Sequence, residues 1–222
     1  MLIFKLKRMA ELLYNEWDLG KRLSGAKGKT CAYIYLFEIL SETEKLVLKK
    51  ENNKIVGFAG YSKWNSKKRI ITKKFYGLMA KILINSPLVK NKQAIYDYNN
   101  EYDNIPSDLN NYFDGELSIL IVDKNYRGKG YGKALLNKIF SLAKTDNMKN
   151  MQILTDESCN FKFYDAMGCK KIRETSVSKK VSEKGEEKYI YEKVLEEGEE
   201  NEVWHNSCRS RSRRLWSCLS VC

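Results

Sequence analysis

The sequence predicts a mixed α/β (α+β) protein built on a mainly antiparallel sheet that is flanked by helices. Three observations support this fold class. Two β-rich runs surround an Asn-Asn turn within residues 45–61, and an apolar strand at 117–122 leads through a glycine-rich loop into a helix. Alternating runs at 171–176 and 188–195 predict a second hairpin. We expect one domain over residues 1–195.

The N-terminal part is expected to form two helices before the first hairpin. Apolar positions recur at helical spacing in residues 2–24, in a run that ends near Gly20. A more apolar stretch follows at 30–40, which predicts a second helix.

Residues 63–112 fit no simple strand pattern and are interpreted as an inserted helical segment. Four apolar residues recur at i, i+4, i+7 and i+11 before Pro87, which predicts one amphipathic helix: Ile71, Phe75, Leu78 and Ile82. Its basic residues are expected to form a solvated face, or else to form a lid or to attract an acidic substrate. A bare loop of this length would be unusual in a compact domain.

The C-terminal part is expected to alternate helices and strands. Apolar residues from Leu135 to Ala143 mark a helix, 151–155 a short buried strand, and 160–167 a helix that Gly168 ends. Residues 196–222 change to an aperiodic Ser, Arg, Cys and Trp mixture, so they are expected to be a disordered or non-native tail outside the fold.

Charge and composition limit the classes of partner. The net charge of +12 favours a phosphorylated cofactor, an acidic substrate or nucleic acid, without choosing among them. No long apolar stretch and no signal-peptide pattern are present, so we expect a cytoplasmic protein with no membrane partner. The six cysteines form no CxxC pair and the single histidine is His205, so neither a metal site nor a histidine-based triad is expected.

The glycine-rich loop between the strand and the following helix is the main functional motif. Backbone N–H groups at a helix N-terminus lack intrahelical partners and carry partial positive charge, which suits a pyrophosphate. The glycines run G-x-G-x-G rather than G-x-G-x-x-G, and Ala134 stands where a Walker loop needs Ser or Thr. The loop consists of Arg127, Gly128, Lys129, Gly130, Tyr131, Gly132 and Lys133.

This Arg-x-x-Gly-x-Gly segment after a strand resembles the acetyl-CoA loop of the GNAT superfamily. The segment Asn160-Phe161-Lys162-Phe163-Tyr164-Asp165-Ala166-Met167-Gly168-Cys169-Lys170-Lys171 is similar to a second GNAT segment, in which an asparagine opens a helix, a Phe-Tyr pair follows and a glycine ends it. The resemblance is good over 114–195, weaker over 1–62, and says little about 63–112.

The resemblance implies a GNAT fold with splayed strands at the acyl-CoA site. Pantetheine would pair with the main chain of Leu120, Ile121 and Val122 as an added strand. The same opening would leave a backbone N–H to stabilise the oxyanion of the thioester carbonyl. The diphosphate would contact the loop from Arg127 to Lys133, and Asn160 would contact the cofactor.

The activity implied by the resemblance is an N-acetyltransferase that moves an acetyl group from acetyl-CoA to a primary amine of a small molecule or protein by direct attack. Tyr164 matches the tyrosine that donates a proton to the departing thiolate, and Glu116 the carboxylate that relays a proton from the amine. Asp114 is a weaker substitute for Glu116. A core aromatic and a surface ion-pair partner are the structural alternatives for Tyr164 and Glu116.

Two other functions stay open from the sequence. A GNAT domain that binds CoA without catalysis would serve as a sensor or partner module. A basic nucleic-acid-binding module, which is less favoured because no nucleic-acid motif is present, would use the loop to grip backbone phosphate. A homodimer and the identity of the amine acceptor are also open.

Overall fold

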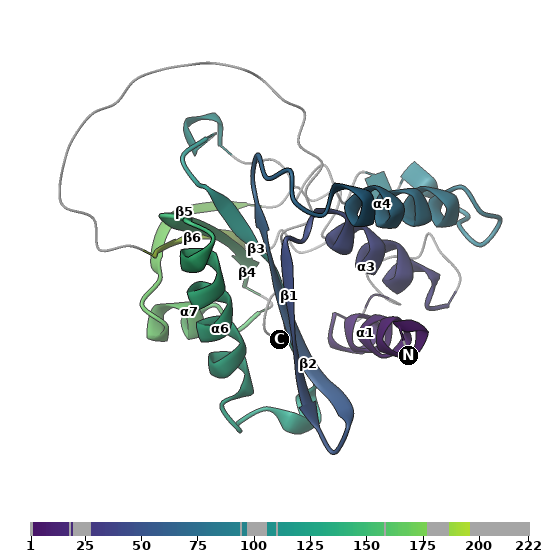
Figure 1. Cartoon of the computed structure of the whole chain (residues 1–222), viewed down its shortest axis with the longest axis horizontal. Coiled ribbons are helices and arrows are strands. Elements are labelled where there is room, and N and C mark those ends of the chain that lie inside the picture. Colours follow the sequence, from purple (N-terminus) through teal and green to yellow (C-terminus); the bar gives the residue numbers. More distant parts are fainter. Residues whose placement is uncertain are drawn as a thin grey trace.

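The computed structural model describes residues 2–17, 19, 28–93, 95–96, 106–109, 111–157, 159–176 and 187–195. The tail expected at 196–222 lies outside the described residues. Figure 1 shows one sheet with helices on both of its faces. The fold class is therefore the mixed α/β arrangement that the sequence predicts.

Within the described residues, the sheet has six strands in the order β1-β2-β3-β4-β6-β5. Both predicted hairpins form, β1 with β2 and β5 with β6, and every pairing is antiparallel except that of β3 with β4. The left-handed backbone of Asn52 and Asn53 makes the β1–β2 turn, as the Asn-Asn pair indicates. The strands are β1 (Lys45–Glu51), β2 (Lys54–Lys63), β3 (Gly115–Val122), β4 (Asn150–Asp156), β5 (Lys170–Ser176) and β6 (Glu187–Val194).

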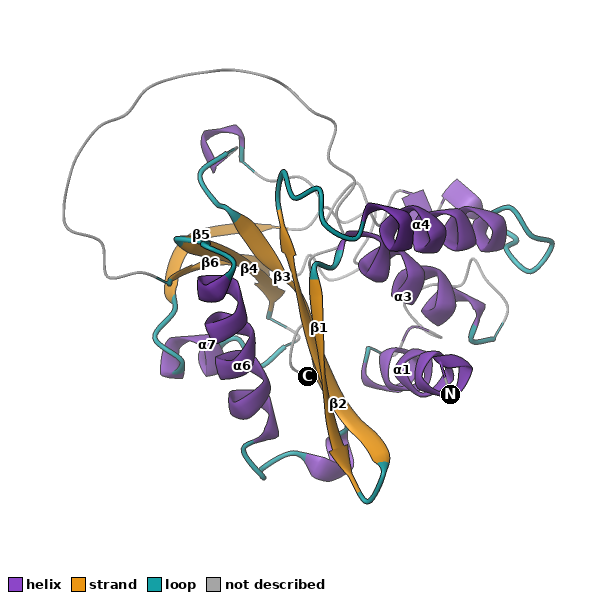
Figure 2. Ribbon diagram, viewed as in Figure 1, coloured by secondary structure: helices purple, strands orange, loops and turns teal. Residues whose placement is uncertain are grey.

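Helices cover the two faces of the sheet with separate apolar cores (Figure 2). On one face, α1 (Leu2–Glu16), α3 (Thr30–Glu42) and α4 (Ile70–Ile84) pack around Ile119 and Ile121 of β3. On the other face, α6 (Tyr131–Thr145) and α7 (Lys162–Ala166) pack around Leu120 and Val122. Alternate side chains of β3 thus enter opposite cores. None of the described helices is long and apolar enough to cross a membrane.

Two predicted helices have different ends in the structure. Helix α1 ends at Glu16, earlier than the expected boundary near Gly20, a residue outside the described set. Helix α7 spans only Lys162–Ala166, so Asn160 lies before it instead of opening it, although the Asn160 carbonyl accepts a bond from the Phe163 N–H. Gly168 follows this helix with φ 68°, as a C-terminal glycine should.

Helix α4 forms where the apolar spacing predicts it, but the residues of that apolar pattern are not the ones that the helix buries. Tyr76, Ala80 and Ile84 are the buried residues of α4. The four apolar residues of the predicted pattern are exposed instead: Ile71, Phe75, Leu78 and Ile82. The helix is apolar on both sides, so the period alone does not decide which side faces α3.

A buried carboxylate connects α6 to the outer strands. Asp146, at the C-terminal end of α6, accepts hydrogen bonds from Tyr61 Oη at 2.6 Å and Lys45 Nζ at 2.9 Å. Burial alone would raise the pKa of Asp146, but these bonds and one from Lys68 outweigh it and lower that pKa to about 2. The carboxylate is therefore ionised when it ties the helix to β1 and β2.

Replacing Gly115 should test the close approach of β2 and β3. A Cβ at Gly115 would lie 2.0 Å from the Ser62 carbonyl oxygen, so Gly115→Ala should lower the free energy of unfolding by about 1–3 kcal/mol. Gly77→Ala is the control, because its Cβ meets only an ordinary contact at 3.6 Å inside a helix; it should raise stability by about 0.5–1 kcal/mol. Urea unfolding measures both, and equal effects would contradict the crowding argument.

Candidate functional site

The parallel strands β3 and β4 meet at one end and then separate. In the described sheet they share a single register position, Glu116 with Gln152. Beyond it, Leu120, Ile121 and Val122 pair with β2, whereas β4 continues against β6. The edge of β3 that faces β4 is therefore left without a ladder over this stretch, which is the splay that the sequence led us to expect.

An irregularity in β3 lies at the start of the splay. Tyr61 pairs with Leu117 and Gly60 with Ile119, so Ser118 is an extra residue between them. Its Oγ lies 2.7 Å from Ser62 Oγ on β2. A bulge of this kind disrupts the ladder locally and redirects main-chain groups, and it occurs here beside the opening between two strands.

The glycine loop lies at the open end of the splay and leads directly into α6. Gly128 and Gly130 have φ values of 77° and 73°, which side chains rarely adopt, and nothing lies within 4 Å of a Cβ built on either one. Gly130 is the N-cap of α6, and no side chain caps that end. The first N–H groups of this 15-residue helix therefore have no side-chain cap, beside a loop whose glycines leave open space, and such an end suits an anionic group.

The loop is braced from both sides by carboxylates that sequence analysis did not identify. Glu16, at the end of α1, pairs with Arg127. Glu51, at the end of β1, accepts bonds from Tyr131 Oη at 2.8 Å and Lys129 Nζ at 3.1 Å, and these bonds lower the pKa of Glu51. Both acids are far from the loop in sequence, and no local spacing relates them to it.

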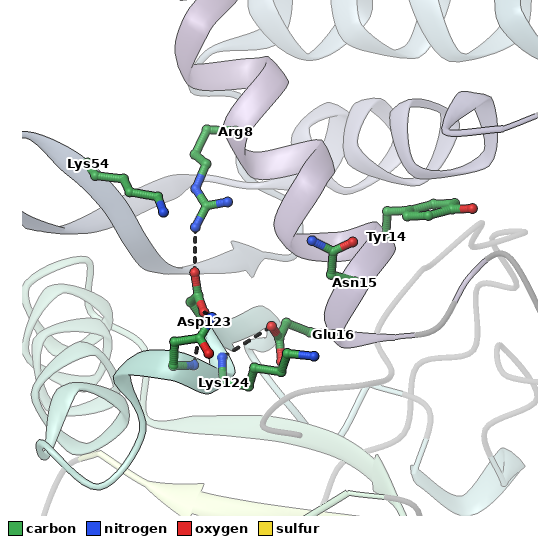
Figure 3. A pocket seen from close by; sticks show the side chains of 8 residues that line it. Arg8, Tyr14, Asn15, Glu16, Lys54, Asp123 and Lys124 are labelled. Carbon is green, nitrogen blue, oxygen red and sulfur yellow. Dashed lines mark hydrogen bonds and ion pairs between the residues drawn. The ribbon is translucent and has the colours of Figure 1, made fainter.

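A hollow of about 420 Å³ lies beside the start of the loop, on the α1 side (Figure 3). Arg8 of α1 donates to Asp123 Oδ2 at 2.5 Å across it, and Glu16 Oε1 accepts from the Lys124 N–H at 3.1 Å. Burial would raise the pKa of Asp123, but the Asn125 N–H and the Arg8 guanidinium lower it overall. Ionic contacts therefore hold α1 against the residues that follow β3.

The second predicted motif lies beside the first. A Cβ at Gly132 would approach the Phe163 ring to 3.6 Å, so α7 packs next to the loop. Tyr164 is fully buried in the same apolar core as Leu120 and Val122, with its ring centroid 5.7 Å from that of Tyr191. The exposed Asn160 precedes α7 at the end of β4. The structure thus brings the residues after the two separating strands together.

The predicted acid Glu116 is at the closed end of the splay. It is buried, and it is level with Gln152, which is in turn level with the buried Glu192 of β6. These three polar side chains share one face of the sheet, and sequence analysis named only the first. Six residues at about 3.3 Å each separate Glu116 from the end of β3. The weaker candidate, Asp114, accepts a bond from the Lys149 N–H at 2.6 Å.

Comparison with known proteins agrees with this geometry. Residues 94–169 match the model of the Acetyltransferase (GNAT) family, and they include the loop and Tyr164. No curated protein matches. Among solved structures, the crystal structure of an acetyltransferase has a TM-score of 0.54 at 14% identity, and the match covers 86% of this chain and 95% of that one.

Two further solved structures have a similar fold. An aminoglycoside 6'-acetyltransferase type Ii has a TM-score of 0.52 at 14% identity and covers 87% of this chain and 92% of its own. PH1933 from Pyrococcus horikoshii OT3 has a TM-score of 0.51 at 17% identity, with 83% and 88% covered. At such identities these structures support the fold of this chain and leave its substrate open.

Removing the Asp123 charge should reveal the ion pair that holds α1. Because the pKa of Asp123 is lowered in the folded protein, its contribution to stability is present above about pH 4 and is lost as the pH falls. Asp123→Asn should therefore destabilise the protein at about pH 7 and have a smaller effect at about pH 3. Urea unfolding at both values measures this, and an effect that does not change with pH would exclude the ionic explanation.

Proposed function

We propose, on the premise that residues 94–169 match the Acetyltransferase (GNAT) family, that this chain is an N-acetyltransferase that moves an acetyl group from acetyl-CoA to a primary amine. The observation that supports the proposal best is the splay of β3 from β4, with an uncapped helix N-terminus at its open end. The open edge of β3 could bind the extended pantetheine, and the helix N-terminus could bind the phosphates attached to it.

The residues of the loop fit the diphosphate of acetyl-CoA. The open space above Gly128 and Gly130 is what a group resting on the backbone would need. The N–H groups of the first turn of α6, from Tyr131 to Lys133, would donate to it. Arg127 and Lys129 would add positive charge while keeping their carboxylate partners, because a guanidinium and an ammonium have several N–H donors.

The pantetheine arm would follow the free edge of β3 along Leu120, Ile121 and Val122. The thioester would then lie toward the closed end of the splay, where the bulge at Ser118 and the carboxylate of Glu116 lie. Asn160, exposed at the end of β4, would contact the same cofactor from the other strand. Acetyl-CoA supplies the activated acetyl group, and the protein supplies orientation and the two proton transfers.

In the proposed reaction, the neutral amine nitrogen forms a bond to the acetyl carbon while the carbon–sulfur bond breaks. Glu116 accepts the proton that the amine loses, directly or through water, and Tyr164 donates a proton to the leaving sulfur. Their burial supports these roles, since proton-transfer groups act most strongly where bulk water is excluded.

The acceptor that fits best is a basic amine, on a small molecule or a protein side chain. Glu116 and Glu192 flank Gln152 on one sheet face, and Tyr112 Oη donates to Glu192 Oε1 at 2.9 Å. Two carboxylates on one face favour a positively charged acceptor over a neutral one.

Acetyl-CoA should stabilise the protein against heat, and a side chain introduced at Gly130 should prevent this stabilisation. At about a hundredfold excess over Kd the melting temperature should rise on the order of 5–10 °C. Gly130→Val should abolish the rise, because a branched side chain cannot easily adopt its φ of 73° or leave the phosphate seat open. Gly28→Val is the matched control, with φ 54° and equally open surroundings elsewhere. If acetyl-CoA does not raise the melting temperature of the wild-type protein, the proposed acetyltransferase activity is excluded.

Tyr164→Phe should lower kcat by about a hundredfold while leaving acetyl-CoA binding intact, because only the proton donor is lost. Thiol release with an amine acceptor measures the rate, and the thermal shift measures binding. Tyr191→Phe, which removes the hydroxyl of the neighbouring buried tyrosine, is the control and should keep most activity. An unchanged kcat in Tyr164→Phe would remove Tyr164 from the mechanism, and no thiol release from any variant would favour a CoA-binding module.

A further inference from the structure

The outer face of α4 carries an apolar stripe that no described element covers. We define the α4 stripe as Ile71, Phe75, Leu78 and Ile82, whose exposed fractions are 82%, 54%, 55% and 52%. At 100° per residue these side chains lie within an arc of about 60°, opposite the face that packs on α3. In Figure 1, α3 lies between α4 and α1, so α4 forms one edge of this helical layer.

This surface is also strongly basic. Residues 63–93 contain no acid and nine cations: Lys63, Lys67, Lys68, Arg69, Lys73, Lys74, Lys81, Lys90 and Lys92. Lys73 pairs with Glu44, and Lys68 with Asp146, at the inner side of the segment. Lys74 and Lys81 lie beside the stripe and are exposed, and within the described residues neither has a carboxylate at ion-pair distance.

The charge argues against a second copy of the chain as the occupant of the stripe. A two-fold interface places the same patch against itself. An antiparallel pairing of two α4 helices would therefore set Lys74 of one copy near Lys81 of the other, and like charges this close are repulsive. The occupant has to bring negative charge to the flanks and accept apolar side chains in the middle.

We propose that the α4 stripe docks on an anionic lipid surface. The stripe extends over twelve residues, about 16 Å along a single convex helix, with lysines at its edge. Such a ridge can insert between headgroups to the depth of its side chains, while Lys74 and Lys81 remain at the level of the lipid phosphates. A membrane supplies both the apolar layer and the negative surface without a matching groove.

This inference replaces the expectation from the sequence that the protein has no membrane partner, and it is independent of the proposed acetyl transfer. Peripheral docking needs no membrane-spanning helix. In Figure 1, α4 lies at the end of the helical layer away from the β1–β2 turn, beside which Glu51 binds the glycine loop, so docking leaves that loop free.

Co-sedimentation of the full chain with vesicles tests the proposal. The wild-type protein should bind phosphatidylcholine vesicles that contain phosphatidylserine and not those of phosphatidylcholine alone. Phe75→Ser with Leu78→Ser should weaken binding about tenfold or more, because the inserted apolar surface is lost. Lys74→Gln with Lys81→Gln should weaken it about tenfold at low salt.

Matched variants control for non-specific hydrophobic binding and for the change in net charge. Ile3→Ser with Phe4→Ser removes two other exposed apolar side chains, and Lys138→Gln with Lys144→Gln removes two exposed lysines of α6. Neither should change binding more than twofold, as expected for changes outside the docking face. Thermal shift with acetyl-CoA should be normal in all variants, which separates this result from the proposed function.

Three outcomes would overturn the proposal. The first is no binding to phosphatidylserine vesicles at low salt. The second is an equal loss of binding in the controls and in the α4 variants. The third is a dimer or an acidic protein ligand in solution that Phe75→Ser with Leu78→Ser disrupts while vesicle binding persists.

Discussion

The separation of β3 from β4 is the constraint on which the rest of the structure depends. A buried strand normally has a hydrogen-bonded neighbour on each side, since an unpaired main-chain group inside a protein is costly. Here β3 pairs with β2 along its length except at the Ser118 bulge, but meets β4 only at Glu116 and Gln152. The freed edge is tolerable because two helical layers pack on the faces of β3 and hold it in place. An open edge held this way is ready to receive an extended ligand.

The phosphate seat at the end of that edge is held by charges from distant parts of the chain. Glu16 pairs with Arg127 from α1, and Glu51 binds Lys129 and Tyr131 from the first hairpin. Each bond is weak where it meets water, but a flexible loop with two open glycines needs several anchors to keep one shape. Helix α1 and the first hairpin therefore support the site through the loop.

Local features of the fold could be predicted from the sequence, and long-range ones could not. The Asn-Asn hairpin, the strand before the loop and the helix after Gly130 follow from turn chemistry and periodicity within a few residues. The bracing by Glu16 and Glu51 depends on which elements become neighbours, so no spacing reveals it. The same limit explains why Glu192 was not associated with Glu116, from which it is separated by an intervening strand.

Helix α4 shows that the spacing of apolar residues can predict a helix without predicting which of its faces is buried. The apolar spacing that predicts the helix is present, but the helix packs on α3 through Tyr76, Ala80 and Ile84 on its opposite side. Lys73 forms an ion pair with the buried Glu44. A helix with two apolar sides can bury only one against a single neighbour. The ion pair of Lys73 selects the inner side, because a buried Glu44 without it would be costly. The stripe is left outside as a consequence of that choice.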